Sequence, residues 1–171
     1  ATLTVTPAYF PQPSGLALDS AGLLYVTDQS TNTVYKIAPS GAIALVAGTS
    51  GSAGSTDGSG AAARFNQPRG LTATSNGTLS VTDTANSTIR RITTDGVVTT
   101  LAGSPTLRGN LDGAGTSATF SSPVGIQLDN NGTLYVADAM NNTVRKITAT
   151  GIVSTLAGNA GSTGLLDGTG S

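Results

Sequence analysis

The chain has 171 residues, a formal net charge of −1 and only 10% charged residues, which argues against a large electrostatic surface for nucleic acid or an anionic membrane. It contains no cysteine and no histidine. Disulfides, zinc-thiolate sites, cysteine nucleophiles and the most common general base are therefore excluded.

One unit of 55 residues occurs three times, without insertion or deletion. Equivalent positions recur in register: Phe10, Phe65 and Phe120; Pro13, Pro68 and Pro123; Val26, Val81 and Val136; Asp28, Asp83 and Asp138; Ile37, Ile92 and Ile147; Gly48, Gly103 and Gly158. A fixed period of this length indicates one supersecondary unit that packs on copies of itself.

Taken in chain order, the first unit predicts four short strands. They are the apolar runs at 15–19, 23–27, 33–37 and 42–46, which are separated by turn residues. The other units carry Asn76-Gly77 and Asn131-Gly132 at the first turn, a strong hairpin signal. Short strands with short turns predict an antiparallel meander.

The strands do not alternate cleanly between apolar and polar residues. Leu101 lies beside Ala102, and Ile152 beside Val153, as expected for a sheet that is buried on both faces. Repeated four-stranded sheets that stack around an axis form a β-propeller, so we expect an all-β propeller fold. A stacked β-solenoid is the alternative, although its repeats are usually shorter.

The connections between units are long. We expect a single domain over 1–171 whose parts are blades at about 13–48, 68–103 and 123–158, long inter-blade loops at 49–67 and 104–122, and terminal segments at 1–12 and 159–171. Loops of this length are either functional or anchored. The recurring Phe is the expected anchor, inserted into the seam between blades.

The repeated string resembles the NHL-repeat propellers, in the long-repeat version common in bacterial envelope and secreted proteins. In the third unit it reads Pro123-Val124-Gly125-Ile126, then Gly132-Thr133-Leu134-Tyr135-Val136-Ala137-Asp138, then Thr143-Val144-Arg145-Lys146-Ile147. The resemblance implies four-stranded blades in closed rings, usually of six. Three blades make half of such a ring and leave two apolar faces bare, so we expect a homodimer that closes a six-bladed ring. The alternative is that the three blades are a piece of a longer ring.

The recurring carboxylates invite a metal-site interpretation. We instead expect Asp28, Asp83 and Asp138 to be structural, each ending the second strand and accepting hydrogen bonds from loop amides. Three separate blades also place them too far apart for one ion. Asp57, Asp112 and Asp167 precede Gly and indicate turns rather than calcium ligands. We expect no metal and no cofactor.

Basic residues recur on the third strand, as Lys36, Arg90-Arg91 and Arg145-Lys146. Some members of the family bind RNA, but adjacent strand residues point to opposite faces, so each pair cannot act as one patch. We expect solvated or salt-bridged charges and no nucleic-acid partner.

Catalysis is the alternative function, as a lyase or hydrolase with its active site in the channel. Related peptide-amidating lyases place metal ligands, largely histidines, around the channel, and this chain has no histidine to match them. No Ser-His-acid set can be assembled either. We therefore expect no enzyme and no catalytic residues.

The predicted function is a non-catalytic binding or scaffolding module. Its ligand, a protein or a glycan, is expected on the face that carries the long connections and the loops between the second and third strands. The candidate binding residues there are Gln29, Arg64, Arg69, Thr84 and Met140. We expect an extracellular or cell-envelope location and no insertion into a membrane.

Overall fold

The computed structural model describes residues 10–162, which form three antiparallel sheets. The first sheet has the order β1 (Pro13–Leu18), β2 (Leu24–Asp28), β3 (Thr33–Ile37) and β4 (Ile43–Gly48). The second contains β6 (Pro68–Ala73), β7 (Leu79–Asp83), β8 (Thr88–Ile92) and β9 (Val97–Gly103). The third contains β11 (Pro123–Leu128), β12 (Leu134–Asp138), β13 (Thr143–Ile147) and β14 (Ile152–Ala157). The all-β fold of meandering sheets is confirmed.

The second and third sheets each gain a fifth strand that the sequence did not predict. It is formed by β5 (Gly58–Ser59) and β10 (Gly113–Ala114), which come from the long connections and pair with β9 and β14. Each is followed by a single 3₁₀ turn, Gly60–Ala62 or Gly115–Ser117. The long connections are therefore partly built into the blade that follows them.

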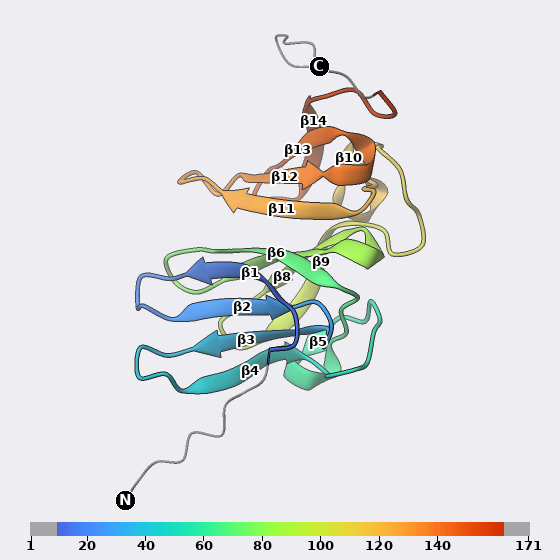
Figure 1. The fold of residues 1–171 in the computed structure, drawn as a ribbon. Helices are drawn as coiled ribbons and strands as arrows, with labels where there is room; N and C mark the ends of the chain where they lie inside the picture. Colours follow the sequence, from blue (N-terminus) through green and yellow to red (C-terminus); the bar gives the residue numbers. More distant parts are fainter. Residues whose placement is uncertain (1–9, 163–171) are drawn as a thin grey trace, which may run out of the picture.

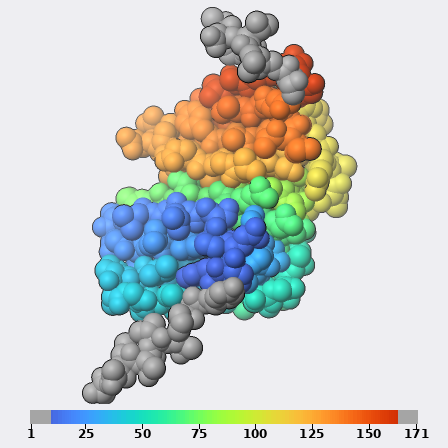
Figure 2. Space-filling view, viewed as in Figure 1, coloured from blue at the N-terminus to red at the C-terminus, as the bar shows by residue number. Residues whose placement is uncertain are grey.

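The three sheets are blades around a common inner edge. Strands β1, β6 and β11 lie together at the centre, and the blades extend away from them (Figure 1). The second blade fills the space between the first and the third (Figure 2). The long connections and the β2–β3, β7–β8 and β12–β13 loops emerge on one side, which we call the loop face. The hairpin turns of each blade emerge on the opposite side, the turn face.

The core lies between the blades rather than inside any one of them. Val34 and Ala47 of the first blade are buried against Leu71, Val81 and Ile92 of the second. An equivalent cluster joins the second blade to the third, through the residues Ile89, Ala102, Ile126, Val136 and Ile147. The second blade is buried on both faces, which explains why its strands do not alternate.

Each blade joint also contains a threonine hydroxyl, on the second strand of the blade, that bridges two neighbouring inner strands. The Thr27 hydroxyl donates to the carbonyl oxygen of Arg69 at 2.7 Å and accepts the Gly15 amide at 2.8 Å. Thr82 repeats this arrangement with Val124 at 2.9 Å. These bonds fix the register of one inner strand against the next.

The recurring Phe anchors the long connections. Phe65 and Phe120 are fully buried, each in the cluster at one blade joint. Among residues 10–162, no helix is long and apolar enough to cross a membrane.

Candidate functional site on the loop face

A buried ion-pair network underlies the loop face in the second blade. The Arg90 guanidinium lies 2.8 Å from the Asp83 carboxylate and 2.6 Å from Asp57 of the long connection. It also donates to the carbonyl oxygens of Thr56 and Arg64, at 3.2 and 2.9 Å. The network therefore ties the connection to β7 and β8.

The network packs against the ring of Phe65, which anchors the long connection. The Arg90 guanidinium carbon lies 5.2 Å from the centre of the Phe65 ring, a cation–π distance. Burial raises the pKa of Asp83 to about 6, against the opposing effect of donors from Asn66, Asn86 and Arg90. The carboxylate is thus a structural group with its lone pairs directed inward, away from any ligand on the surface.

The third blade repeats the network. Arg145 lies 3.2 Å from Asp138 and 2.7 Å from Asp112, with its guanidinium carbon 5.1 Å from the Phe120 ring centre. Burial likewise raises the pKa of Asp138. Both arginines are fully buried, so neither can contribute to a basic surface.

The first blade lacks this network. Tyr35 stands where the other blades have Arg, and its ring packs edge-on against Phe10 with centroids 5.3 Å apart. Asp28 accepts hydrogen bonds from the Gln12, Ser30 and Thr31 amides. Burial alone would raise the pKa of Asp28, but these donors outweigh it and hold the pKa below its usual value.

Two hollows open on the loop face, one at each blade joint. The first hollow, between blades 1 and 2, has a volume of about 500 Å³. Its polar walls are formed by Gln12, Gln29, Ser30, Asn32, Asn66, Gln67 and Arg69. Volumes of this size are typical of small-molecule sites.

The second hollow, between blades 2 and 3, has a volume of about 400 Å³. It is lined by Gln67, Arg69, Thr84, Ala85, Arg108, Ser122, Val124, Ala139 and Met140. Gln67 and Arg69 line both hollows, so the two form one surface that crosses the second blade. Its only charged lining residues among those described are the two arginines.

The backbone is strained at the centre of this surface. Gln67 has a φ of +53° and Ser122 a φ of +55°, in the left-handed region that non-glycine residues rarely adopt. The Gln67 amide is held by the side-chain oxygen of Asn32 at 2.8 Å. Strain of this kind persists only where the surroundings enforce it, and it clusters at functional sites.

The structure separates the predicted binding residues into two groups. Gln29 and Arg69 line the first hollow, and Arg69, Thr84 and Met140 line the second. The Thr84 hydroxyl is already used, because it donates to the Pro123 carbonyl oxygen at 2.7 Å. Arg64 is not brought to either hollow: its guanidinium folds back onto Thr49 and the Ala61 and Ala63 carbonyl oxygens.

Sequence reasoning missed the amide side chains of the site. Gln12, Asn66 and Gln67 were not singled out, although Gln12 and Gln67 directly precede the recurring Pro. It also missed the partners of the buried arginines, and it took Asp57 and Asp112 only as turn residues. Asp167 lies outside the described residues. Within 10–162, no group of three potential metal-binding side chains comes together.

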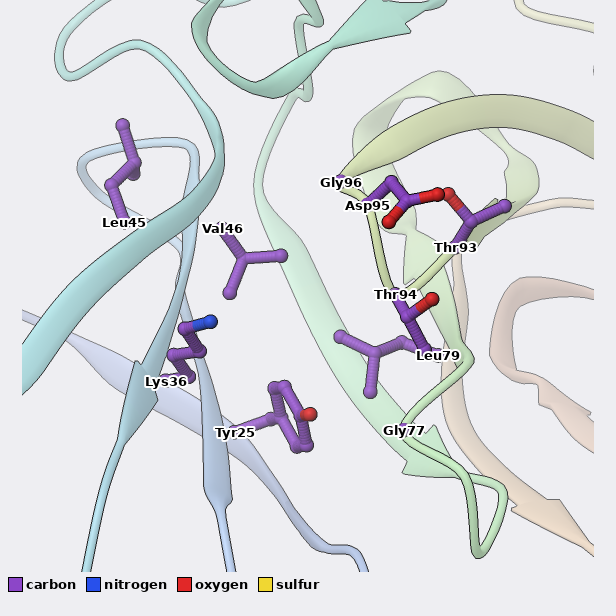
Figure 3. Close-up of a pocket in the computed structure, with 10 residues that line it drawn as sticks. All are labelled: Tyr25, Lys36, Leu45, Val46, Gly77, Leu79, Thr93, Thr94, Asp95 and Gly96. Carbon is purple, nitrogen blue, oxygen red and sulfur yellow. The ribbon is translucent and has the colours of Figure 1, made fainter.

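A smaller hollow lies on the turn face between blades 1 and 2 (Figure 3). Its volume is about 130 Å³, and its wall includes Tyr25, Lys36, Thr94 and Asp95. The Tyr25 hydroxyl is already engaged by Asp19 at 3.0 Å. This space accommodates only a few water-sized groups. A second turn-face hollow, between blades 2 and 3, has a volume of about 510 Å³ and includes Arg91, Leu128 and Ala149 in its lining. The loop face is therefore preferred for its converging amide side chains and not for its size.

The fold and the polar end of its blades define the class of protein, a β-propeller. The NHL repeat model matches residues 10–34, 65–92 and 120–147, one segment in each blade. The chain therefore carries three NHL repeats, which confirms the family expected from the sequence. No curated protein matches the chain.

Several solved structures share the fold. A structural genomics protein of unknown function from Bacteroides thetaiotaomicron is 26% identical, with a TM-score of 0.68 over 86% of this chain and 36% of its own. An auxiliary nutrient binding protein from the same species is 23% identical, with a TM-score of 0.68 over 82% of this chain and 36% of its own. A streptogramin B lyase is 21% identical, with a TM-score of 0.59 over 89% of this chain and 43% of its own. The chain thus spans about 36–43% of the length of these propellers.

Proposed function

We propose that the chain is a non-catalytic binding module whose loop face takes a neutral glycan. The observation that carries this proposal is the convergence of amide side chains from two blades around Arg69. Amides offer both donors and acceptors, which match the hydroxyl groups of a sugar. Asp28 and Asp83, which lie beneath the loop face, accept hydrogen bonds from within the chain. The loop face itself therefore presents no strong negative charge.

Titration with neutral oligosaccharides, selected on a glycan array, tests this proposal. Arg69→Ala and Gln67→Ala are each expected to weaken binding roughly tenfold, the loss that accompanies a hydrogen bond of about 1.4 kcal/mol. Lys36→Ala, on the turn face, is the matched control and is expected to bind normally. Equal affinities for all three variants, or no binding by the unaltered chain, would contradict the proposal.

The same module, we propose, completes a six-bladed ring by pairing with a second copy. The first blade exposes Leu16 and Leu18 at 62% and 65%, and the third blade exposes Leu156 at 46%. Bare apolar sheet faces of this kind are uncommon on monomers. Light scattering should then give a mass near twice 16.8 kDa, whereas a monomer at high concentration would refute ring closure.

The catalytic alternative is less well supported by the loop-face chemistry. Its lining groups are amides, hydroxyls and guanidinium groups, none of which is a good general base near neutral pH. The likeness to a lyase is a likeness of fold. An extracellular or envelope location is part of the proposal and rests on the similarity to the nutrient binding protein.

A further inference from the structure

Glycines on the inner strands mark the positions where the backbones of neighbouring blades come into close contact. A Cβ added to Gly15 would collide with the carbonyl oxygen of Arg69, and one added to Gly70 would collide with that of Val124. Neither glycine has a positive φ. Close approach of the following inner strand is therefore what requires glycine at these two positions.

Gly125 holds the same position in the third blade, but no described strand approaches it. The nearest atom to an added Cβ is that of Ala137, at 3.7 Å, which is ordinary contact. The surrounding face is equally open: Val144 is 38% exposed, whereas its equivalents Val34 and Ile89 are fully buried. The third blade thus has the glycine and the apolar residue that form a joint in the other blades. No neighbouring blade covers them among the described residues.

The first blade presents the complementary face. Leu71 and Ile126, which enter the two existing joints, are 6% and 9% exposed. Their equivalent Leu16 is 62% exposed. The first and third blades therefore each carry one half of the joint that forms twice between the described blades.

We propose that the open face of the third blade, around Gly125 and Val144, binds strand β1 of a second copy. The carbonyl oxygen of the partner's Ser14 would approach Gly125 as that of Arg69 approaches Gly15. This inference rests on the proposed ring closure, and it adds which faces meet and which residues touch. The contact is head-to-tail, so two copies of a half ring form it twice when the ring closes.

The joint between copies differs from the internal joints in one group. Thr27 and Thr82 bond across the internal joints, whereas Ala137 occupies this position in the third blade and has no hydroxyl. The joint between copies is therefore the weakest in the ring. It would also build a third loop-face hollow, from Ala139 and Met140 of one copy and the partner's Gln12 and Gln29.

Sedimentation equilibrium of the 171-residue chain and two variants tests the proposal. Gly125→Val is expected to give a folded monomer, because a Cβ there makes only an ordinary contact with Ala137 in the single chain. Ala137→Thr restores the missing hydroxyl at both joints and is expected to tighten the dimer roughly 30-fold. Gly70→Val, which strikes a backbone oxygen within the chain, is the contrasting variant and should lose its folded circular-dichroism spectrum.

The outcomes separate this joint from ring closure itself. A wild-type monomer would overturn both proposals. A wild-type dimer that neither Gly125→Val nor Ala137→Thr alters would overturn the joint and leave dimerisation standing. Larger, concentration-dependent assemblies that Gly125→Val abolishes would support the joint and refute the closed ring. None of these results depends on whether the loop face binds glycans.

Discussion

The first and second blades have the same strands in the same order, but they hold the anchoring Phe in different ways. In the second blade Phe65 lies against Arg90, which reaches both Asp83 and Asp57. In the first blade Phe10 lies against Tyr35. The comparison teaches that the ionic network is an addition to the repeat. What the fold itself requires is a large planar group beside the Phe.

Removing the buried carboxylate should produce the largest difference between the two blades. Asp83→Asn replaces the oxygen that accepts from Asn86 and Arg90 with an amide nitrogen that can only donate, so we expect a loss of about 3–5 kcal/mol in the free energy of unfolding at pH 4. Asp28→Asn, in the first blade, weakens hydrogen bonds from loop amides but faces no buried guanidinium group. It should cost about 1–2 kcal/mol. Urea denaturation measures both, and equal losses would show that the ion pair adds nothing.

The same pair predicts a pH dependence. Because the pKa of Asp83 is raised to about 6 in the folded chain, its contribution to stability is full below about pH 4 and is lost as pH rises through 6. The stability difference between wild type and Asp83→Asn should therefore shrink by up to about 3 kcal/mol between pH 4 and pH 7. Urea midpoints across this range measure it, and a constant difference would contradict the raised pKa.

The hydroxyl that crosses each joint offers a third comparison. Thr82→Val removes the bond to the Val124 carbonyl oxygen and leaves the Gly70 amide without its acceptor, at a cost of about 1–3 kcal/mol. Thr27→Val should behave alike at the other joint. Thr99→Val is the matched control, because Thr99 is an exposed residue of β9 that lies at no joint. A similar loss in the control would point to β-strand packing rather than the hydroxyl.

The smallest expected effect is a gain in stability from the substitution Ser87→Asn. Ser87 occupies the left-handed position that Asn32 and Asn142 hold in the other blades, and its buried hydroxyl has no partner. Asn adopts this conformation more readily, and its side chain would reach the Ser122 amide as Asn32 reaches Gln67. We expect Ser87→Asn to raise stability by about 0.5–1 kcal/mol, read as a rise in Tm. Asn32→Ser should show the reverse.

Repetition made the strands predictable, because three aligned copies of each turn and apolar run reinforced one another. Asn76-Gly77 does form the hairpin turn that it indicates, with Gly77 at a φ of +85°. The short strand β5 could not be found in this way. Gly58-Ser59 has neither strand propensity nor alternation, and it becomes a strand only because β9 is there to pair with it.

The site was harder to predict than the blades. Arg90 and Asp57 are 33 residues apart in the sequence. No local pattern indicates which residue of the long connection will lie beside Arg90. Arg64 is polar and close to the loop face, so it was an understandable candidate. Its side chain is instead captured by carbonyl oxygens of its own connection, a local competition that residue type alone does not reveal.

The two-residue strands β5 and β10 have a consequence for behaviour at high concentration. They occupy part of the outer edge of β9 and β14, where unpaired backbone groups would otherwise template fibril growth. Each consists of Gly and one small residue, Ser59 or Ala114, and Gly and Ala have low β propensity. The second and third blades are thereby capped at the rim, so β9 and β14 make poor templates for amyloid growth at high concentration.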